Sequence, residues 1–367
     1  LNIVLDDSSE TLNEVVVTGY QVQRKADLTG SVSVVSTKDL KSSSDTDPMR
    51  SLQGKVPGMT ISTDGSPIGT GTVRIRGIGS FNSSQDPLFV IDGVPTTTTL
   101  NSLNMNDIES MQVLKDAASA SIYGSRAANG VIIITTKHGK KGDKLNVDFS
   151  ANVTAQFYNS QSMMKLCNTT EYARNYGLDL NAATGTSIRA YDPATGGYNS
   201  STVNGAYDGY INSKKTMRFS DTDWLDAISR TGFMRNYDLS LSGATDKFTG
   251  LFSLGYKKND GILKYSNFEN FSARFNSTYQ VNKIVSVGEN ATITYSKQCD
   301  SAPMENALKM SPTVPVYEED GETFGGPVGG MSDRQNPLRE MYQNLDNALK
   351  IWRVFGNAFV DVKPLKG

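Results

Sequence analysis

Few residues of this 367-residue chain have the types and spacing that catalysis or metal binding requires. His138 is the only histidine, so no second imidazole can join it at a zinc site. The chain has no Gly-x-Ser-x-Gly motif, and its Gly-x-Gly strings at 69–71 and 77–79 do not open the helix of a βαβ unit. The residues therefore predict neither an enzyme nor a dinucleotide-binding protein, and they indicate no cofactor and no metal.

The cysteines and the histidine have structural interpretations instead. Cys167 and Cys299 lie far apart and form no metal-binding pattern. They are either two unpaired small residues in loops or the two halves of a disulfide. His138 lies just past the end of an expected strand, a position that fits a turn residue better than a ligand.

Two arginines have a spacing that could matter. Arg74 and Arg76 are two residues apart in a β-prone segment, so we expect them to share one face of a strand. On a solvent-exposed surface, two arginines on one strand face indicate no particular function. Inside a protein each guanidinium would need a carboxylate, because an unpaired buried charge is very costly.

The bulk composition narrows the class of protein. Net charge is −2, with acids and bases interspersed, which argues against nucleic-acid binding. Mean hydropathy is −0.38, and no run approaches the ~18 apolar residues of a transmembrane helix. The 33 glycines, 16 tyrosines and 14 phenylalanines suit a β protein.

The segment from Thr72 to Lys137 organises the chain. It reads as short β-branched strands, separated by Gly, Pro and Asp turns, with one short helix. We expect Asp116 to cap that helix and Gly124 to end it. The continuous apolar run Val131–Ile134 predicts a strand buried on both faces. Together these elements predict a small mixed α+β domain with its own core.

Three motifs in this segment carry a resemblance to a known family. They are Arg-Ile-Arg-Gly (74–77), Phe-Val-Ile-Asp-Gly-Val-Pro (89–95) and Ile-Glu-Ser-Met-Gln-Val-Leu-Lys-Asp (108–116). In this order they resemble the plug of a TonB-dependent outer-membrane transporter, in particular its SusC/RagA branch, and the resemblance extends over the whole chain. It implies import of an oligosaccharide or oligopeptide across the outer membrane, energised by TonB with ExbB and ExbD. It also implies a SusD-like surface lipoprotein as partner, and plug–barrel contacts through Arg74 and Arg76.

The sequence also predicts other elements of the plug. We expect strands at 31–36 and 56–61, and a short helix at 47–54 capped by Asp47. The polar segment 77–87 is interpreted as a loop at the plug apex. Its aromatic, amide and hydroxyl groups suit a neutral oligomer, although a solvated turn without a role is the alternative. The candidate ligand-binding residues are Ser80, Phe81, Asn82, Ser83 and Gln85.

A β-prone peptide precedes the plug and resembles a TonB box. A box of this kind binds TonB by β-augmentation, in which an extended peptide pairs its backbone with an edge strand of the partner. The alternative is an ordinary plug strand, and the position ahead of the plug favours the box. The candidate TonB-binding residues are Glu14, Val15, Val16, Val17 and Thr18.

Beyond residue 140 the pattern changes to strict alternation. From Leu145 to Phe157, seven apolar residues alternate with six polar ones without an error. Five more alternating segments follow, around 237–242, 248–257, 271–279, 285–295 and 352–360. Polar partners such as Asp148, Ser240, Arg274 and Asn276 suit a wet lumen or a plug, and the apolar set suits lipid. Glu289 breaks the apolar phase of the fifth of these segments, so we expect a bulge or a contact with another protein there.

Long and short connections alternate between these segments, as they do in outer-membrane barrels. The fold predicted is an α+β plug followed by antiparallel transmembrane β-barrel strands, about six of the ~22 in a plugged transporter. Residues 1–7 would end an extension domain, 8–26 form the linker with the TonB box, 27–139 the plug and 140–367 the first part of the barrel. The plug and box would be reached from the periplasm, and the long loops would be extracellular. The alternative functions are a non-transporting receptor or adhesin and a soluble β-rich binding module.

Overall fold

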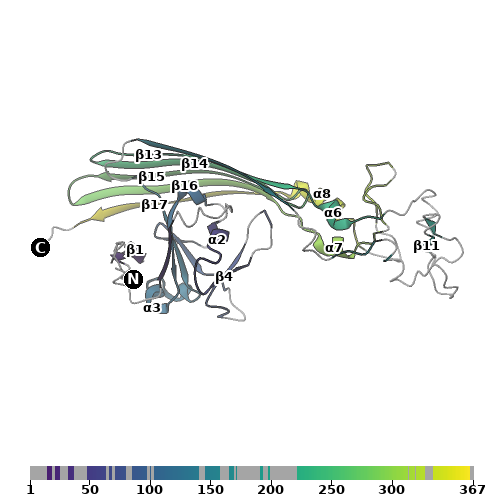
Figure 1. Ribbon diagram of the computed structural model, residues 1–367. Helices are drawn as coiled ribbons and strands as arrows, with labels where there is room; N and C mark the ends of the chain where they lie inside the picture. Colours follow the sequence, from purple (N-terminus) through teal and green to yellow (C-terminus); the bar gives the residue numbers. More distant parts are fainter. Residues whose placement is uncertain are drawn as a thin grey trace, which may run out of the picture.

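Two bodies of secondary structure lie against one another in the computed structural model (Figure 1). A plug is built from residues before 139, and six long strands arch over it as a wall. The structure describes residues 15–18, 21–24, 32–36, 48–62, 66–67, 71–79, 85–96, 100, 103–139, 145–157, 165–168, 171, 191–192, 197–198, 221–312, 314–318, 320–326 and 334–363.

The plug combines a mixed sheet with single helical turns. Its sheet has the order β3-β8-β9-β6-β7, in which β6 and β9 run parallel and the other neighbours antiparallel. The strands are β3 (Val32–Ser36), β6 (Leu88–Ile91), β7 (Val94–Thr96), β8 (Ile108–Leu114), β9 (Val131–Thr136) and a separate pair, β4 (Met59–Ser62) with β5 (Thr72–Ile75). The helical turns are α2 (Pro48–Ser51), η3 (Met105–Asp107), α3 (Ala117–Ala120) and η4 (Ser121–Ala127). The predicted small mixed sheet is confirmed.

Strand β9 is the centre of the plug. Its residues Val131 to Ile134 are at most 2% exposed. Because side chains alternate across a strand, Ile132 and Ile134 enter one apolar core while Val131 and Ile133 enter another on the opposite face. The prediction that this run is buried on both faces is confirmed.

The wall is a single antiparallel sheet with the order β10-β13-β14-β15-β16-β17. Its strands have 11 to 15 residues, enough to cross a bilayer when tilted. They are β10 (Asn146–Gln156), β13 (Gly232–Ala244), β14 (Phe248–Asp260), β15 (Asn267–Gln280), β16 (Val285–Cys299) and β17 (Leu349–Val362). Each corresponds to one of the six alternating segments, so the alternation predicted the wall correctly.

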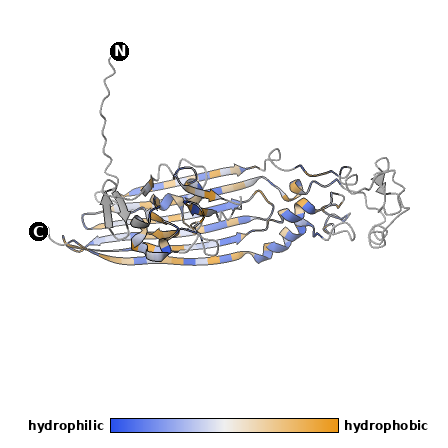
Figure 2. Ribbon diagram, turned by 90° about the horizontal axis from the view of Figure 1, so that it is seen from below, coloured by the Kyte–Doolittle hydropathy of each residue, from blue (hydrophilic) through white to orange (hydrophobic). Residues whose placement is uncertain are grey.

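Hydrophobic and hydrophilic residues alternate along the strands of the wall (Figure 2), so its two faces differ in polarity. Neighbouring residues of β15 illustrate the difference: Phe275 is 43% exposed on the outer face, whereas Arg274 and Asn276 are at most 2% exposed on the inner face, against the plug. Phe149 and Trp352 are each 70% exposed on the outer face. An apolar face of this extent needs a covering, which a lipid bilayer supplies.

Glu289 lies on the outer face, as the alternation predicts, but without the predicted bulge. Glu289 is exposed and accepts a hydrogen bond from the Ser277 hydroxyl of β15 at 2.9 Å. The register runs regularly through it, with Ser277 on one side and Ala358 on the other. The predicted bulge is therefore wrong, because the backbone register is unbroken at Glu289. A contact between Glu289 and another protein stays a prediction.

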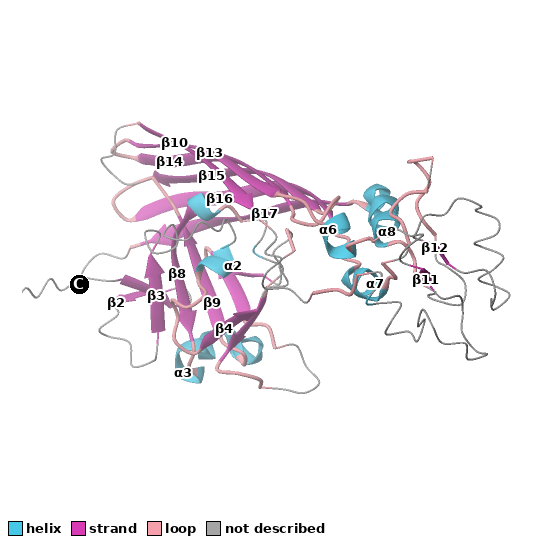
Figure 3. Cartoon of the chain, turned by 45° about the vertical axis from the view of Figure 1, so that its right-hand side comes forward, coloured by secondary structure: helices cyan, strands magenta, loops and turns pink. Residues whose placement is uncertain are grey.

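The long connections of the wall contain a further apolar core, separate from the two in the plug, that the sequence did not predict. The helical turns α6 (Trp224–Ile228), α7 (Met304–Lys309), α8 (Pro337–Gln343) and η6 (Asn344–Asn347) gather at the end of the wall far from the plug (Figure 3). Trp224, Ile228 and Met341 are at most 1% exposed there. The Trp224 indole donates to the Ser311 carbonyl at 2.9 Å. A two-residue strand pair, β11 (Tyr191–Asp192) with β12 (Gly197–Tyr198), lies in the first connection.

Some local expectations in the plug need correction. Asp116 precedes α3, but its side chain makes no capping hydrogen bond, because the carboxylate pairs with Arg76 at 2.5 Å. Helix α3 ends at Ala120, and Gly124 instead adopts a positive φ of 66° inside η4. Strand β4 begins at Met59, three residues later than expected. Asp47 lies outside the described residues.

Both cysteines are unpaired, as one of the two interpretations held. Cys167 is exposed, and the buried Cys299 thiol, at the end of β16 rather than in a loop, donates to the Asn344 carbonyl at 3.3 Å. Within the described parts of the chain, no helix is long and apolar enough to cross a membrane.

The two faces of the wall should label differently in membranes. In a Cys167→Ser background of the whole protein, Asp148→Cys should react quickly with a water-soluble thiol reagent, and Phe149→Cys should react at least about tenfold more slowly, because lipid covers the outer face. Reaction rates in intact membranes and after unfolding in urea provide the measurement and its control. Equal rates in intact membranes would indicate a soluble sandwich.

Candidate functional site

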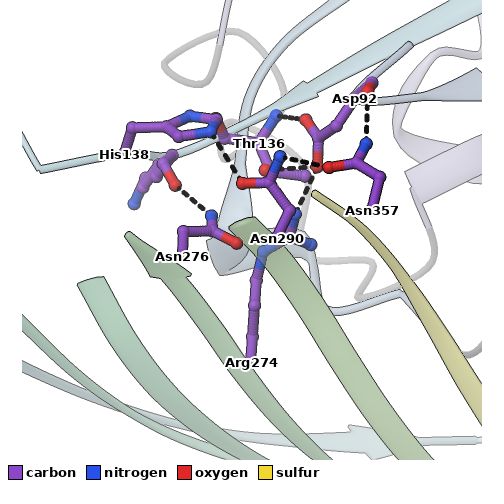
Figure 4. Close-up of polar contacts among 8 residues, drawn as sticks. Asp92, Thr136, His138, Arg274, Asn276, Asn290 and Asn357 are labelled. Carbon is purple, nitrogen blue, oxygen red and sulfur yellow. Dashed lines mark hydrogen bonds and ion pairs between the residues drawn. The ribbon is translucent and has the colours of Figure 1, made fainter. Parts of the chain in front are cut away.

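A buried ion pair fastens the plug to the inner face of the wall (Figure 4). Asp92 of the plug pairs with Arg274 of β15, and their side chains are 4% and 2% exposed. A buried ion pair needs additional hydrogen bonds to offset its lost hydration. Thr136 of β9 supplies them: its backbone N–H and its hydroxyl donate to Asp92 at 2.9 and 2.8 Å, and its hydroxyl accepts from Arg274. Asn276, two residues along β15, donates to the Lys137 carbonyl at 2.8 Å.

Local turn chemistry places Asp92 at this position. Asp92 and Gly93 form the two-residue loop between β6 and β7, with φ angles of 46° and 83°. A tight hairpin loop with positive φ at both central residues favours Asp-Gly, since aspartate tolerates this region and glycine adopts it freely. The turn therefore presents the Asp92 carboxylate at the end of strands β6 and β7, where it contacts Arg274 of β15.

A chain of amide groups extends the contact across β16 and β17. Asn357 of β17 donates to the Asp92 carbonyl at 3.1 Å, and Asn290 of β16 donates to the Asn357 side chain at 3.0 Å. The Asn290 side-chain oxygen lies 3.1 Å from His138 Nε2, and His138 Nδ1 lies 2.7 Å from the Thr136 carbonyl. The lone histidine is thus a contact between plug and wall.

A second set of contacts joins the plug to β13. Asn104 and Asn106, which flank the start of η3, both donate to the buried carboxylate of Asp238. Asp107 follows directly and is buried at the same interface. Burial raises the pKa of Asp107, while the positive charge of Arg274 opposes that rise. Asparagine amides therefore solvate the carboxylate of Asp238, and burial disfavours the charged form of Asp107.

A third contact lies nearer the end of the wall that carries the helical turns. The Ser66 hydroxyl of the plug donates to Asp300, just beyond β16, at 3.0 Å. Asn259 of β14 donates to the adjacent Pro67 carbonyl at 3.3 Å. Together the three sets of contacts reach every strand from β13 to β17, so the plug is held by the polar face of the whole sheet.

The arginines that the sequence singled out lie within the plug. Strand β5 ends at Ile75, and Arg76 adopts a positive φ of 60°, so it leaves the strand instead of sharing a face with Arg74. Arg76 pairs with Asp116, and Arg74 is half-buried in β5. In the described ion pair between plug and wall, the wall supplies the arginine and the plug the acid. A role for Arg74 and Arg76 against other barrel acids stays a prediction.

The candidate ligand-binding loop is described only at its end. Ser80, Phe81, Asn82 and Ser83 lie outside the described residues. Gln85 is half-buried and leads into β6. Ligand contact by this loop stays a prediction.

The candidate TonB box has an extended backbone. Val15–Thr18 form strand β1, which pairs antiparallel with β2 (Gln21–Arg24), and Val16 lies opposite Gln23. Glu14 lies outside the described residues. A peptide of this conformation suits strand addition, because its backbone is already arranged for pairing.

The site as a whole is a polar interface that attaches the plug to the inner face of the wall. Among the described residues, no group of three or more His, Cys, Asp or Glu side chains could hold a metal ion. The buried acids at the interface face amides, hydroxyls and one guanidinium. The alternation predicts that Arg274 and Asn276 face the lumen or the plug, and both contact the plug. It does not predict the role of Asp92, for which the Asp-Gly dipeptide is the available signal.

Comparisons with known proteins agree with this architecture. The family profile of the TonB-dependent receptor plug domain matches residues 24–131. TonB-dependent receptor P26 of Formosa agariphila is 32% identical over 98% of this chain and 34% of its own length. TonB-dependent receptor SusC of Bacteroides thetaiotaomicron is 35% identical over 89% of this chain and 31% of its own. The RagAB peptide importer in its open-open state has a TM-score of 0.77 at 27% identity, covering 96% of this chain and 41% of that one. The chain thus spans about a third of the length of these curated relatives.

Proposed function

Because the chain belongs to the SusC/RagA family of TonB-dependent receptors, we propose that it forms the plug and first wall strands of an outer-membrane importer. The observation that supports this most is the plug itself, held on the polar face of an amphipathic wall by the buried Asp92–Arg274 pair. A plug with this attachment closes a pore and can be displaced only by work. The matched relatives are named receptors, importers and transporters, and we infer no catalytic reaction for this chain.

The work would come from TonB, driven by ExbB and ExbD in the inner membrane. Glu14 to Thr18 would be the attachment point, and the extended backbone of Val15–Thr18 supports this assignment. TonB would either add to the free edge of β1 or replace β2 as its partner. Pulling on this peptide would then displace part of the plug.

The opposite end of the wall would face the cell exterior. The helical turns α6, α7 and α8 share a core there, so the described parts of the long connections offer a packed surface at the wall end. Such a surface suits a SusD-like surface lipoprotein that covers the lumen as a lid. The lid, the receptor and the substrate would then form one closed compartment.

The substrate would be an oligopeptide or an oligosaccharide. One similar solved structure is named a peptide importer, which supports the peptide. In the apex loop, Ser80, Phe81, Asn82, Ser83 and Gln85 offer an aromatic face with amide and hydroxyl groups, which suits either class. The alternative function, a non-transporting receptor or adhesin on the same scaffold, would need the binding loops but no coupling peptide.

Energy dependence tests the proposal directly. Cells that produce the whole receptor with its lipoprotein should accumulate a fluorescent oligopeptide or oligosaccharide from a mixed library, and a protonophore should abolish accumulation while leaving surface binding intact. Cells without the receptor provide the control. Accumulation that persists with the protonophore would indicate a passive pore, and binding without any accumulation would indicate the receptor or adhesin.

A further inference from the structure

Two lysines and two aromatic rings form a block on the outer face of β16 and β17. Lys297 and Lys350 are direct cross-strand partners, and so are Tyr295 and Trp352 in the next row on the same face. The rings of Tyr295 and Trp352 lie 4.8 Å apart between centroids and are tilted by 43°. Lys350 is exposed, Lys297 is half-buried, and both lie at the strand ends that lead to the long connections.

The aromatic pair belongs to a row that crosses the wall. Register joins Tyr237, Tyr256, Phe271, Tyr295 and Trp352, one residue from each strand from β13 to β17. Aromatic side chains gather where the hydrocarbon of a bilayer meets its headgroups, and the Tyr295–Trp352 pair is the part of this row beside the lysines. The lysines, two residues further along their strands, therefore lie at headgroup depth.

The described acids near this row are engaged elsewhere, and no ion pair joins either lysine to them. Arg235 of β13 lies 3.4 Å from Asp260. Glu269, the other cross-strand partner of Lys297, accepts a hydrogen bond from the Tyr256 hydroxyl at 2.7 Å. Among the described residues, no ion pair includes Lys297 or Lys350. Like charges directly opposite on adjacent strands destabilise a sheet, so an anion between the two ammonium groups would relieve that repulsion.

The surface in line with the block on the same two strands is aliphatic. Ile293 and Val354 are direct partners there and are 45% and 78% exposed. Ala291 and Gly356 follow, and their small size leaves a shallow strip. Cations, rings and aliphatic groups thus succeed one another along β16 and β17, which matches a molecule with an anionic head and an apolar tail.

We propose that Lys297 and Lys350 bind the phosphate headgroup of a membrane lipid, with Tyr295 and Trp352 beneath it and its acyl chain along Ile293 and Val354. Two ammonium groups offer six N–H donors, which suit the oxygens of a phosphate monoester. Strands that pair edgewise with β17 cover its backbone edge and leave its outer face free, so the site persists in a larger sheet. This inference rests on the proposed outer-membrane location, where the lipid would be a phosphorylated glycolipid of the outer leaflet.

Lipid binding by the whole receptor tests the proposal. Purified receptor would be placed in nanodiscs of phosphatidylcholine with fluorescent lipid A, or with dephosphorylated lipid A. Lys297→Ala with Lys350→Ala should weaken lipid A binding about tenfold or more, because two charge-assisted contacts are lost. The parent should prefer lipid A over its dephosphorylated form by a similar factor. Lys297→Arg with Lys350→Arg keeps both charges and should bind nearly as the parent does.

A second pair of lysines provides the matched control. Lys247 and Lys283 are exposed in the short turns at the opposite end of the wall, and replacing both by alanine makes the same charge change. Unchanged lipid A binding by the Lys297/Lys350 double variant, or equal loss in the Lys247/Lys283 variant, would overturn the site. If inorganic phosphate competed for the site as strongly as unlabelled lipid A does, the lipid assignment would be rejected, and the site would bind a free phosphate ion instead. Uptake is not measured here, so failure of the import proposal and failure of this one remain distinguishable.

Discussion

Replacing Arg274 with alanine should weaken the attachment of the plug to the wall by about 3–5 kcal/mol, because it leaves the buried Asp92 carboxylate without its counter-ion. The Thr136 hydrogen bonds remain, but they cannot neutralise the charge. The whole receptor in detergent should lose thermal stability. Hydrogen exchange should rise most in β9, which carries Thr136, and in the β6–β7 hairpin, whose turn carries Asp92.

Two variants make this result specific. Lys309→Ala removes an exposed ion pair with Glu305, and water replaces such a pair without measurable loss of stability. Asp92→Asn with Arg274→Met carries neither charge, and asparagine is also favoured in the tight turn. This double variant should regain most of the lost stability. An Arg274→Ala receptor as stable as the Lys309→Ala receptor would show that the buried pair does not hold the plug.

Replacing Val16 with proline should abolish energised uptake and leave substrate binding unchanged. Proline has no N–H to donate, and its fixed φ near −65° does not suit a paired strand. Addition of the box to TonB needs a continuous backbone ladder, and Val16 lies in the middle of β1. Uptake by cells and ligand binding by the purified receptor, measured side by side, separate coupling from recognition.

Val16→Thr is the matched control, because threonine keeps the N–H and the β-branched shape. Its uptake should remain close to that of the parent. Normal uptake by the proline variant would reject Val15–Thr18 as the TonB box, and loss of binding by it would point to a folding role for the β1–β2 pair.

The wall could be predicted strand by strand because its signal is local. Alternation between Leu145 and Phe157 specifies both the strand and its two faces from adjacent residues. The same holds for β9, whose uninterrupted apolar run predicted burial on both sides, and for the Asp92–Gly93 hairpin, whose dipeptide is a turn signal.

The remaining features depend on contacts between distant segments. Asp92 and Arg274 are 182 positions apart, and no local pattern indicates that they meet. The helical turns α6 to α8 have only five to seven residues each, which is too short for a helical period to be visible. They become a core only when two long connections pack together. Arg76 leaves its strand because its partner Asp116 lies elsewhere in the plug.

The strand order of the plug has a mechanical consequence. A load applied at Val15–Thr18 enters the plug sheet through β3, which is an edge strand and pairs with β8 at only five positions. The hairpin that carries Asp92 lies at the opposite edge of that sheet. A pull from the N-terminal side is therefore borne by β3 before it can reach the tether at Arg274. Strand β3 would therefore separate from β8 first, and the hairpin that carries Asp92 would stay attached to the wall.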